Sequence, residues 1–320
     1  MTCQYVPPER HVPTLAEDVR NGLLERPRSL PPKYFYDDYG SRLFDQICDT
    51  PEYYLTRTED ALLSSGAADI IAKSHPDHII EFGSGASRKT RHLLDACVLN
   101  DQTCTYWPFD VCESALLEAA RELTRDYEWL TINALSGDYL AGLKHLPHPQ
   151  GRCLFTFLGS TIGNFEKWQT IEFLTELRQR MRSQDTLLLG ADRTKDIRVL
   201  EAAYNDTQGI TAQFNLNLLR VLNREMNANF DMDAYRHLAY YNGDLQQIEM
   251  YLTIVRPQTV EISDLGKEIH FVAGERILTE ISRKFTSGDL DEILQKSSFS
   301  LMAHYEPRNR YFSLLLVRPR

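Results

Sequence analysis

The segment HIIEFGSGASRKT, residues 78–90, decides the fold class of this chain. Its first five residues are mostly apolar, which is typical of a short buried strand, and a glycine-rich turn at Gly83 and Gly85 leads into a helical pattern. Glycines at such a turn let backbone N–H groups approach a ligand at the start of the next helix. The segment therefore predicts a strand, a ligand-binding turn and a helix.

The same alternation of strand and helix continues on both sides of this segment. We predict strands at 78–82, 105–109, 130–134, 153–159 and 186–192, and helices at 56–74, 87–97, 112–125 and 168–181. Short apolar strands that alternate with helices indicate a parallel sheet with helices on both faces.

The pattern changes after residue 192. Two helical stretches, at about 195–206 and 210–224, precede several strand-like segments with short polar breaks, which is typical of an antiparallel α+β module. The last 35 residues return to a helix and two strands that suit an antiparallel edge of the first sheet. We therefore predict a discontinuous layout, with a cofactor-binding domain at 60–192 plus 286–320 and a substrate-binding domain at 1–59 plus 193–285.

Composition excludes several classes of protein. The chain has 320 residues with a formal net charge of −10, and no apolar run approaches the roughly 20 residues that cross a bilayer. The N-terminus has no apolar signal region, so we expect a cytoplasmic protein without a membrane partner. The chain has no long cluster of Lys and Arg, so we expect no nucleic-acid partner. The six cysteines and nine histidines show no metal-ligand spacing, so we expect no metal. The enclosed insertion suggests a monomer.

Acidic residues stand at the ends of three predicted strands. Glu81 precedes the glycine turn, Asp110 lies in FDV (109–111) where the second strand ends, and Asp138 lies beside Tyr139 in GDY. A carboxylate there can accept both ribose hydroxyls, while the Asp138–Tyr139 pair could hydrogen-bond and flank an adenine. Each carboxylate could instead cap a helix, and such a turn alone also occurs in folds that bind other nucleotides or nothing.

Three acidic strand ends in register indicate a pocket for a cationic nucleoside. The turn departs from the G-x-G-x-x-G dinucleotide fingerprint, because Arg88 stands three residues after Gly85. S-adenosylmethionine (SAM), whose sulfonium is positive, therefore fits better than NAD or ATP. The residues that we assign to the cofactor site are Glu81, Gly83, Ser84, Gly85, Lys89, Asp110, Asp138 and Tyr139.

Longer motifs carry a family resemblance over nearly the whole chain, from about residue 15 to residue 320. The motifs are LPPKYFYDDYGSRLFDQICDTPEYYLTRTE (30–59), EFGSGASRKT (81–90), FLGSTIGNF (157–165), LLLGADRTKD (187–196), FNLN (214–217) and LTEISRKF (278–285). Together they resemble the histidine Nα-methyltransferase family of ergothioneine biosynthesis. The resemblance implies a Rossmann-like class I methyltransferase sheet with a second α+β domain, and transfer of three methyl groups from SAM to the α-amine of L-histidine, giving hercynine.

The resemblance also implies where the amino acid binds. The GSTIGN loop of such enzymes contacts the amino acid, which assigns Gly159 and Asn164 here, and Tyr204 in AAYND matches a tyrosine that holds the amino-acid backbone. These three residues form the predicted catalytic group. The residues that match positions around the imidazole are Tyr54, Met250, Glu280 and Ser282.

Glu280 is the predicted specificity residue. A carboxylate can accept an imidazole N–H, but it would lie unpaired against an indole that lacks the second ring nitrogen. Without the resemblance, Glu280 would be interpreted as a surface ion pair and Asn164 as turn chemistry. Tyr54, Tyr204 and Met250 would be interpreted as core residues.

The alternative functions are N-methylation of another aromatic amino acid such as tryptophan, and cofactor binding without catalysis.

Overall fold

A computed structural model describes residues 1–320 and divides the chain into two compact units. Unit 1 comprises residues 1–12, 55–194 and 284–320, and unit 2 comprises residues 13–54 and 195–283.

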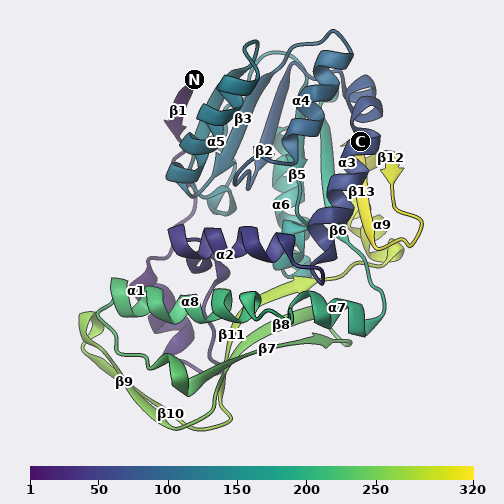
Figure 1. The fold of residues 1–320 in the computed structure, drawn as a ribbon. Coiled ribbons are helices and arrows are strands. Elements are labelled where there is room, and N and C mark those ends of the chain that lie inside the picture. The colour runs from purple at the N-terminus through teal and green to yellow at the C-terminus, as the bar shows by residue number, and fades with distance from the viewer. The chain divides into compact units, whose positions relative to one another are not determined.

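An eight-stranded sheet forms the centre of unit 1 (Figure 1). In spatial order its strands are β1 (Thr2–Tyr5), β4 (Thr131–Ser136), β3 (Thr105–Asp110), β2 (His78–Phe82), β5 (Cys153–Phe157), β6 (Thr186–Asp192), β13 (Phe312–Pro319) and β12 (Phe299–Tyr305). The first six strands are parallel to their neighbours, and β13 and β12 complete the sheet in antiparallel register. All seven residues of β6 are buried, as expected for a strand inside a parallel sheet.

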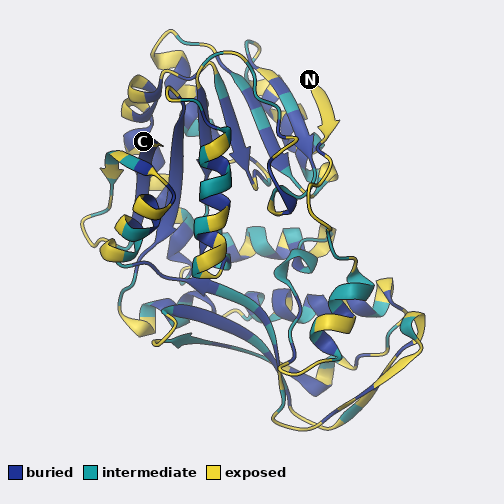
Figure 2. Ribbon diagram, turned by 180° about the vertical axis from the view of Figure 1, so that it is seen from behind, coloured by how far each residue is buried: buried dark blue, intermediate teal, exposed yellow.

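Helices cover both faces of this sheet, and each helix exposes its outer side (Figure 2). Apolar residues of α3 (Tyr54–Ser74), α4 (Thr90–Leu99) and α5 (Glu113–Asp126) form one core with the sheet. Residues of α6 (Lys167–Arg180) and α9 (Ser287–Lys296) form the other core. The carboxyl ends of β2, β3, β4 and β5 therefore meet at one edge, where ligands of such sheets bind.

The N-terminal segment differs from the predicted layout. We predicted residues 1–59 in the second domain, but residues 1–12 and 55–59 belong to unit 1. Residues 55–59 lie in α3, whose later turns also belong to unit 1. For residues 1–12 the reason is backbone pairing, because β1 adds a parallel strand beside β4, with Thr2 opposite Asn133. This strand is fully exposed and lacks an apolar pattern, so the sequence carried no signal for it.

Unit 2 contains two antiparallel sheets and several helices. The larger sheet has the order β11 (Arg276–Arg283), β8 (Gln247–Ile254) and β7 (Tyr235–Asn242), and the smaller one pairs β10 (Lys267–Phe271) with β9 (Gln258–Ile262). Its helices are α1 (Leu15–Asp18), α2 (Asp38–Asp49), α7 (Ile197–Ala203) and α8 (Ile210–Glu225). This α+β composition agrees with the predicted module, although β7 and α2 were not predicted.

Local chemistry explains why α2 begins inside the tyrosine-rich loop. Asp37 caps the helix by accepting a hydrogen bond from the Gly40 backbone N–H at 2.8 Å. A Cβ on Gly40 would lie 1.7 Å from the Phe35 carbonyl oxygen, so this close approach requires glycine. Asn217 of α8 donates a second hydrogen bond to Asp37 at 2.8 Å. The FNLN motif thus fastens α2 to α8.

Candidate active site

The turn after β2 leaves its backbone open to a ligand. Gly83 and Gly85 have positive φ values of 67° and 47°, and a Cβ on Gly85 would meet no atom within 4 Å. The buried Ser84 hydroxyl makes no hydrogen bond inside the protein. Glycine at φ values that other residues rarely adopt, beside an unpaired polar atom, is typical of a turn that accepts a ligand.

Asp110, at the end of β3, organises this turn. One carboxylate oxygen accepts the Gly85 N–H at 2.9 Å, and the other accepts the Cys112 N–H at 3.0 Å. Each oxygen keeps a lone pair for a hydroxyl donor, because a carboxylate accepts about four hydrogen bonds. Asp138 accepts the Leu140 N–H at 2.8 Å and so caps the short helical turn Tyr139–Ala141.

Tyr139 belongs to an aromatic cluster of the sheet core. Its ring contacts those of Phe82, Phe109 and Phe157 edge-on, with centroids 5.7 to 5.9 Å apart. Burial raises the pKa of its hydroxyl, which lies 3.2 Å from the position of a Cβ on Gly83. Tyr139 therefore adjoins the glycine turn while most of its ring is packed inside the protein.

Glu81 lies beneath the turn. Its carboxylate is buried and accepts hydrogen bonds from the Thr90 and Tyr106 hydroxyls. Burial raises its pKa to about 7, although both hydrogen bonds and the charge of Lys89 oppose this shift. The structure thus surrounds Glu81 with protein groups, so we expect its charge, rather than direct contact, to act on a ligand.

The GSTIGN loop follows β5 at the same edge of the sheet. Gly159 and Ser160 adopt positive φ values of 74° and 56°. The Ser160 hydroxyl accepts the Asp192 backbone N–H at 2.8 Å, which fixes the loop to the end of β6. Asn164 ends the helical turn Thr161–Asn164, and its half-buried amide makes no hydrogen bond inside the protein. The loop therefore presents an amide with unused donor and acceptor groups.

In unit 2 the structure brings together Tyr204, Ser282, Met250 and Glu280. The hydroxyls of Tyr204 and Ser282 are hydrogen-bonded, and both residues are buried. Glu280 of β11 pairs with Met250 of β8, next to a register shift after Leu278. Such a bulge changes the direction in which the following side chains point, and it is frequent beside functional sites.

Tyr54 is the first residue of α3 and belongs to unit 2, whereas the rest of this helix belongs to unit 1. Its hydroxyl accepts a hydrogen bond from the Lys195 ammonium at 2.6 Å. Lys195 also lies 4.1 Å from the centre of the Tyr54 ring. A surface cavity of about 490 Å³ in unit 2 includes Tyr54 in its lining.

Several residues around these groups had no predicted role. His237 accepts a hydrogen bond from the Asn215 amide at Nδ1, 2.9 Å away, and donates from Nε2 to the Tyr204 carbonyl oxygen at 2.8 Å. The carboxylate of Glu59, inside the TRTE motif, accepts hydrogen bonds from the Lys89 ammonium and the Gly159 backbone N–H. His237 and Glu59 were missed because their partners are distant in the sequence, and sequence spacing does not reveal such contacts.

The tyrosine-rich segment also contributes to an aromatic cluster of Phe35, Tyr36, Phe44, Tyr53 and Phe214.

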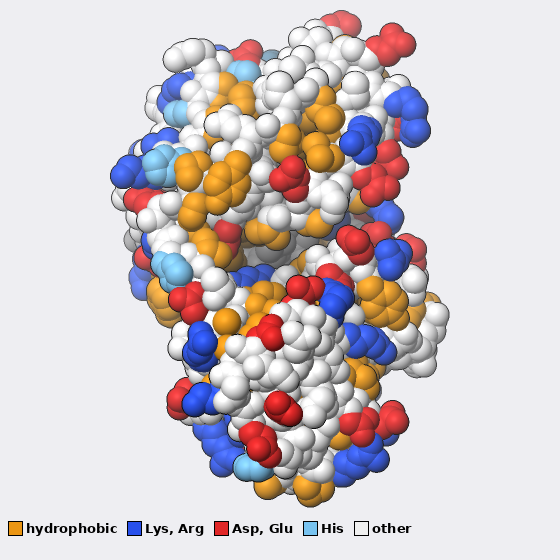
Figure 3. All heavy atoms as spheres, turned by 90° about the vertical axis from the view of Figure 1, so that its left-hand side faces the viewer, with side chains coloured by type: hydrophobic (Ala, Val, Ile, Leu, Met, Phe, Trp, Pro, Cys, Tyr) orange, Lys and Arg blue, Asp and Glu red, His pale blue; other side chains and the backbone are white.

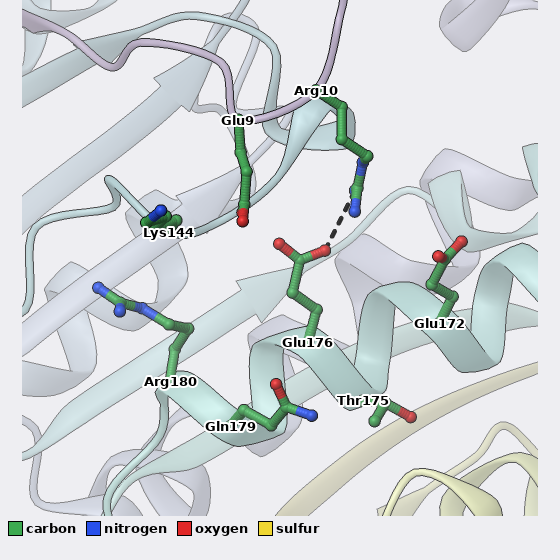
Figure 4. A pocket seen from close by; sticks show the side chains of 8 residues that line it. All are labelled: Glu9, Arg10, Lys144, Glu172, Thr175, Glu176, Gln179 and Arg180. Atoms are coloured by element: carbon green, nitrogen blue, oxygen red, sulfur yellow. Dashed lines mark hydrogen bonds and ion pairs between the residues drawn. The ribbon is translucent and has the colours of Figure 1, made fainter.

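A larger surface cavity, of about 540 Å³, lies elsewhere in unit 1 (Figure 4). Its lining includes both acidic and basic side chains, and Arg10 forms an ion pair with Glu176 at 3.1 Å. It contains none of the predicted site residues. Its lining residues are Glu9, Arg10, Lys144, Glu172, Thr175, Glu176, Gln179 and Arg180.

One group of side chains has the composition of a metal site. Potential ligand atoms of His148, Cys153 and Asp185 lie within 4.8 Å of one another. Asp185 already accepts the backbone N–H groups of Cys153 and Arg182, and burial raises the pKa of Cys153 to about 12. The group lies at the start of β5, away from the strand ends that carry the predicted site. The expectation that no metal takes part stays a prediction.

Comparison with known proteins identifies the family. Residues 15–319 match the family described as histidine-specific methyltransferase, SAM-dependent. The chain belongs to this family. The histidine N-alpha-methyltransferase of Mycolicibacterium smegmatis is 46% identical over 281 residues, which cover 88% of this chain and 87% of that protein. The enzyme of the same name from Mycobacterium tuberculosis is 46% identical over 271 residues, covering 85% and 84%.

A more distant relative is ergothioneine biosynthesis protein 1 of Schizosaccharomyces pombe. It is 30% identical over 299 residues, which cover 90% of this chain and 38% of that longer protein. The predicted family is therefore confirmed. The predicted fold class is confirmed too, because this chain has one mostly parallel sheet and two separate antiparallel sheets.

The surface and the helices bear on the expected partners. No helix is both long enough and apolar enough to cross a membrane. On the face shown in Figure 3, Lys and Arg side chains are interspersed with Asp and Glu rather than gathered in one patch. The expectations of a monomer and of no nucleic-acid partner stay predictions.

Proposed function

We propose that this member of the histidine-specific family transfers methyl groups from SAM to the α-amine of L-histidine, and that the final product is the trimethylated betaine hercynine. The observation that carries the proposal is the 46% identity to two histidine N-alpha-methyltransferases over most of each chain. The relationship to ergothioneine biosynthesis protein 1 supports a role in the first step of ergothioneine formation.

The glycine turn of unit 1 fits the proposed cofactor. Its open Gly85 and the unpaired Ser84 hydroxyl leave room and a polar contact for a ligand. Asp110 would accept the ribose hydroxyls, and Asp138 with Tyr139 would contact the adenine. When bound, SAM supplies an activated methyl group on a positive sulfur. The residues that would hold it are Gly83, Ser84, Gly85, Lys89, Asp110, Asp138 and Tyr139, while Glu81 would act on it through its charge.

The amino acid would be held at both ends. Asn164 can donate to its carboxylate and accept from its amine, while Gly159 and Tyr204 fix its backbone. Tyr54, Met250, Glu280 and Ser282 would surround the imidazole, with Glu280 accepting a ring N–H. Methyl transfer from a sulfonium needs alignment and an unprotonated amine rather than a covalent nucleophile. The amine proton can leave to water, because amino groups of this kind lose it near mildly alkaline pH.

Retention of the intermediates is a further requirement of three transfers. The faces of tyrosine rings attract methylated ammonium ions, so Tyr204, which we assign to the amino-acid backbone, would favour retention of mono- and dimethylhistidine over their release.

A competition assay tests the substrate. Purified protein receives SAM with a labelled methyl group and equal concentrations of L-histidine, L-tryptophan and L-tyrosine, without added metal. Mass spectrometry should find the label in histidine. Label in tryptophan alone would favour the alternative aromatic substrate. Cofactor binding without any labelled product would favour a non-catalytic homologue.

A further inference from the structure

A buried carboxylate in unit 1 has no part in the function proposed so far. Glu59 lies in the second turn of α3, and its side chain has no exposed surface. A buried charge is costly unless it is paired and hydrogen-bonded, so the partners of Glu59 are informative.

Glu59 holds two residues of the proposed site at once. Both of its oxygens lie 2.9 Å from the backbone nitrogen of Gly159, the first residue of the GSTIGN loop. One of the same oxygens pairs with the ammonium of Lys89, which precedes α4. A Cβ on Gly159 would lie 3.7 Å from the Lys89 nitrogen, so the three groups are close together. The carboxylate therefore links the amino-acid loop to the cofactor lysine.

The neighbouring strand leaves space for this carboxylate. Gly190 lies inside β6, where every residue is buried, and a Cβ there would stand 2.1 Å from a Glu59 oxygen. Glycine inside a strand weakens it and often marks a close approach by another group. The absent side chain at residue 190 thus matches the position of Glu59.

Only a carboxylate of this length suits both partners. The Gly159 N–H and the Lys89 ammonium are both donors: one Glu59 oxygen accepts from both of them, and the other oxygen also faces the Gly159 N–H. A glutamine would place its NH₂ group at one of these two oxygen positions, and so would direct a donor at the Gly159 N–H in either orientation. An aspartate is one methylene shorter, so it cannot keep both contacts without moving α3.

We propose that Glu59 is a positioning residue for methyl transfer, which holds the Gly159 loop and Lys89 in the arrangement that binds L-histidine and SAM. This inference rests on the proposed function of the two partners. Glu59 acts through them and need not touch either substrate.

Steady-state kinetics of three variants test this role below the unfolding temperature of each. Glu59→Gln should raise the KM of both histidine and SAM, and lower each kcat/KM about 10- to 100-fold, the usual range for a lost hydrogen bond to a charged group. Gly190→Ala should displace the same carboxylate and raise the histidine KM in the same direction. The double variant Glu59→Gln with Lys89→Met should recover much of the histidine affinity, because the introduced glutamine then faces a single donor, while its SAM affinity stays low.

Glu292→Gln is the matched control. Glu292 pairs with Lys167 and Lys296 on the surface of α6 and α9, so its loss should leave both KM values unchanged. Wild-type KM values in both Glu59→Gln and Gly190→Ala, or no recovery in the double variant, would overturn the inference. Wild-type protein that methylates no histidine would instead contradict the proposed function itself.

Discussion

The Tyr204 hydroxyl donates a hydrogen bond to the Ser282 hydroxyl, with the two oxygens 2.8 Å apart. Tyr204 follows α7 and Ser282 lies on β11, so the bond joins two elements of unit 2 that are distant in sequence. The Tyr204 backbone is fixed separately, because its carbonyl accepts a hydrogen bond from His237. Two predicted contacts of the amino acid are therefore held in one network.

Ser282→Ala should raise the histidine KM about tenfold, because the buried Tyr204 hydroxyl loses this partner. Tyr204→Phe should act in the same direction. Since each variant breaks the same bond, the double variant should fall short of the product of the two effects, as a double-mutant cycle measures. Ser263→Ala, on the β9–β10 turn, is the control. Strictly multiplicative effects on KM would mean that the pair does not act as a unit.

Asn164→Ala should weaken histidine binding about tenfold and change the SAM KM little, because the unused Asn164 amide is the proposed contact of the amino-acid carboxylate. Asn164→Asp should bind histidine more weakly still, since two carboxylates would face each other. Isothermal titration with L-histidine measures both variants against Asn21→Ala, an exposed asparagine. Unchanged affinity in both would remove Asn164 from the site.

Glu280→Gln should lower kcat/KM for histidine about 10- to 100-fold, because the ring N–H loses a charged acceptor. The value for tryptophan should change little, so the discrimination between the two amino acids should shrink. Parallel assays with both substrates give this ratio. An equal loss for both amino acids would show that Glu280 supports the fold rather than specificity.

Glu81 predicts a pH dependence of stability. Its pKa rises from 4.5 to about 7 in the folded protein, so the folded state binds more protons than the unfolded state between these values. The free energy of unfolding that Glu81 contributes is therefore present at low pH and lost as the pH rises from about 4.5 to 7. Glu81→Gln removes this loss. Denaturant unfolding at several pH values should show the variant gaining on the wild type across this window, and a constant difference would contradict the raised pKa.

The strands that the sequence predicted correctly are the buried ones of the parallel sheet, because burial on both faces requires an apolar run. The segment 186–192 is apolar from Leu187 to Ala191, and the structure has β6 at these residues. The exposed strand β1 and the amphipathic strand β7 were missed, because pairing with a neighbour, rather than their own pattern, makes them strands. The same limit applies to the assignment of residues 1–12.

The sequence predicted those site residues that lie in recognisable motifs, but not the long-range contacts between them. The strand-end positions of Asp110 and Asp138 follow from the alternating pattern, and each carboxylate also accepts a hydrogen bond from a backbone N–H two residues later in the chain. The bulge before Glu280 depends on the pairing of β11 with β8, so the local sequence could not predict it. Glu59 lies 100 residues before Gly159, and only the packing of α3 against the sheet brings them together.

A time course of the products shows whether the protein trimethylates the α-amine of L-histidine. Purified protein is incubated with L-histidine and excess SAM, and mass spectrometry follows the histidine species. We expect mono- and dimethylhistidine as transient species and Nα-trimethylhistidine as the final product. Histidine that stays unmethylated, or methylation confined to the imidazole ring, would contradict it.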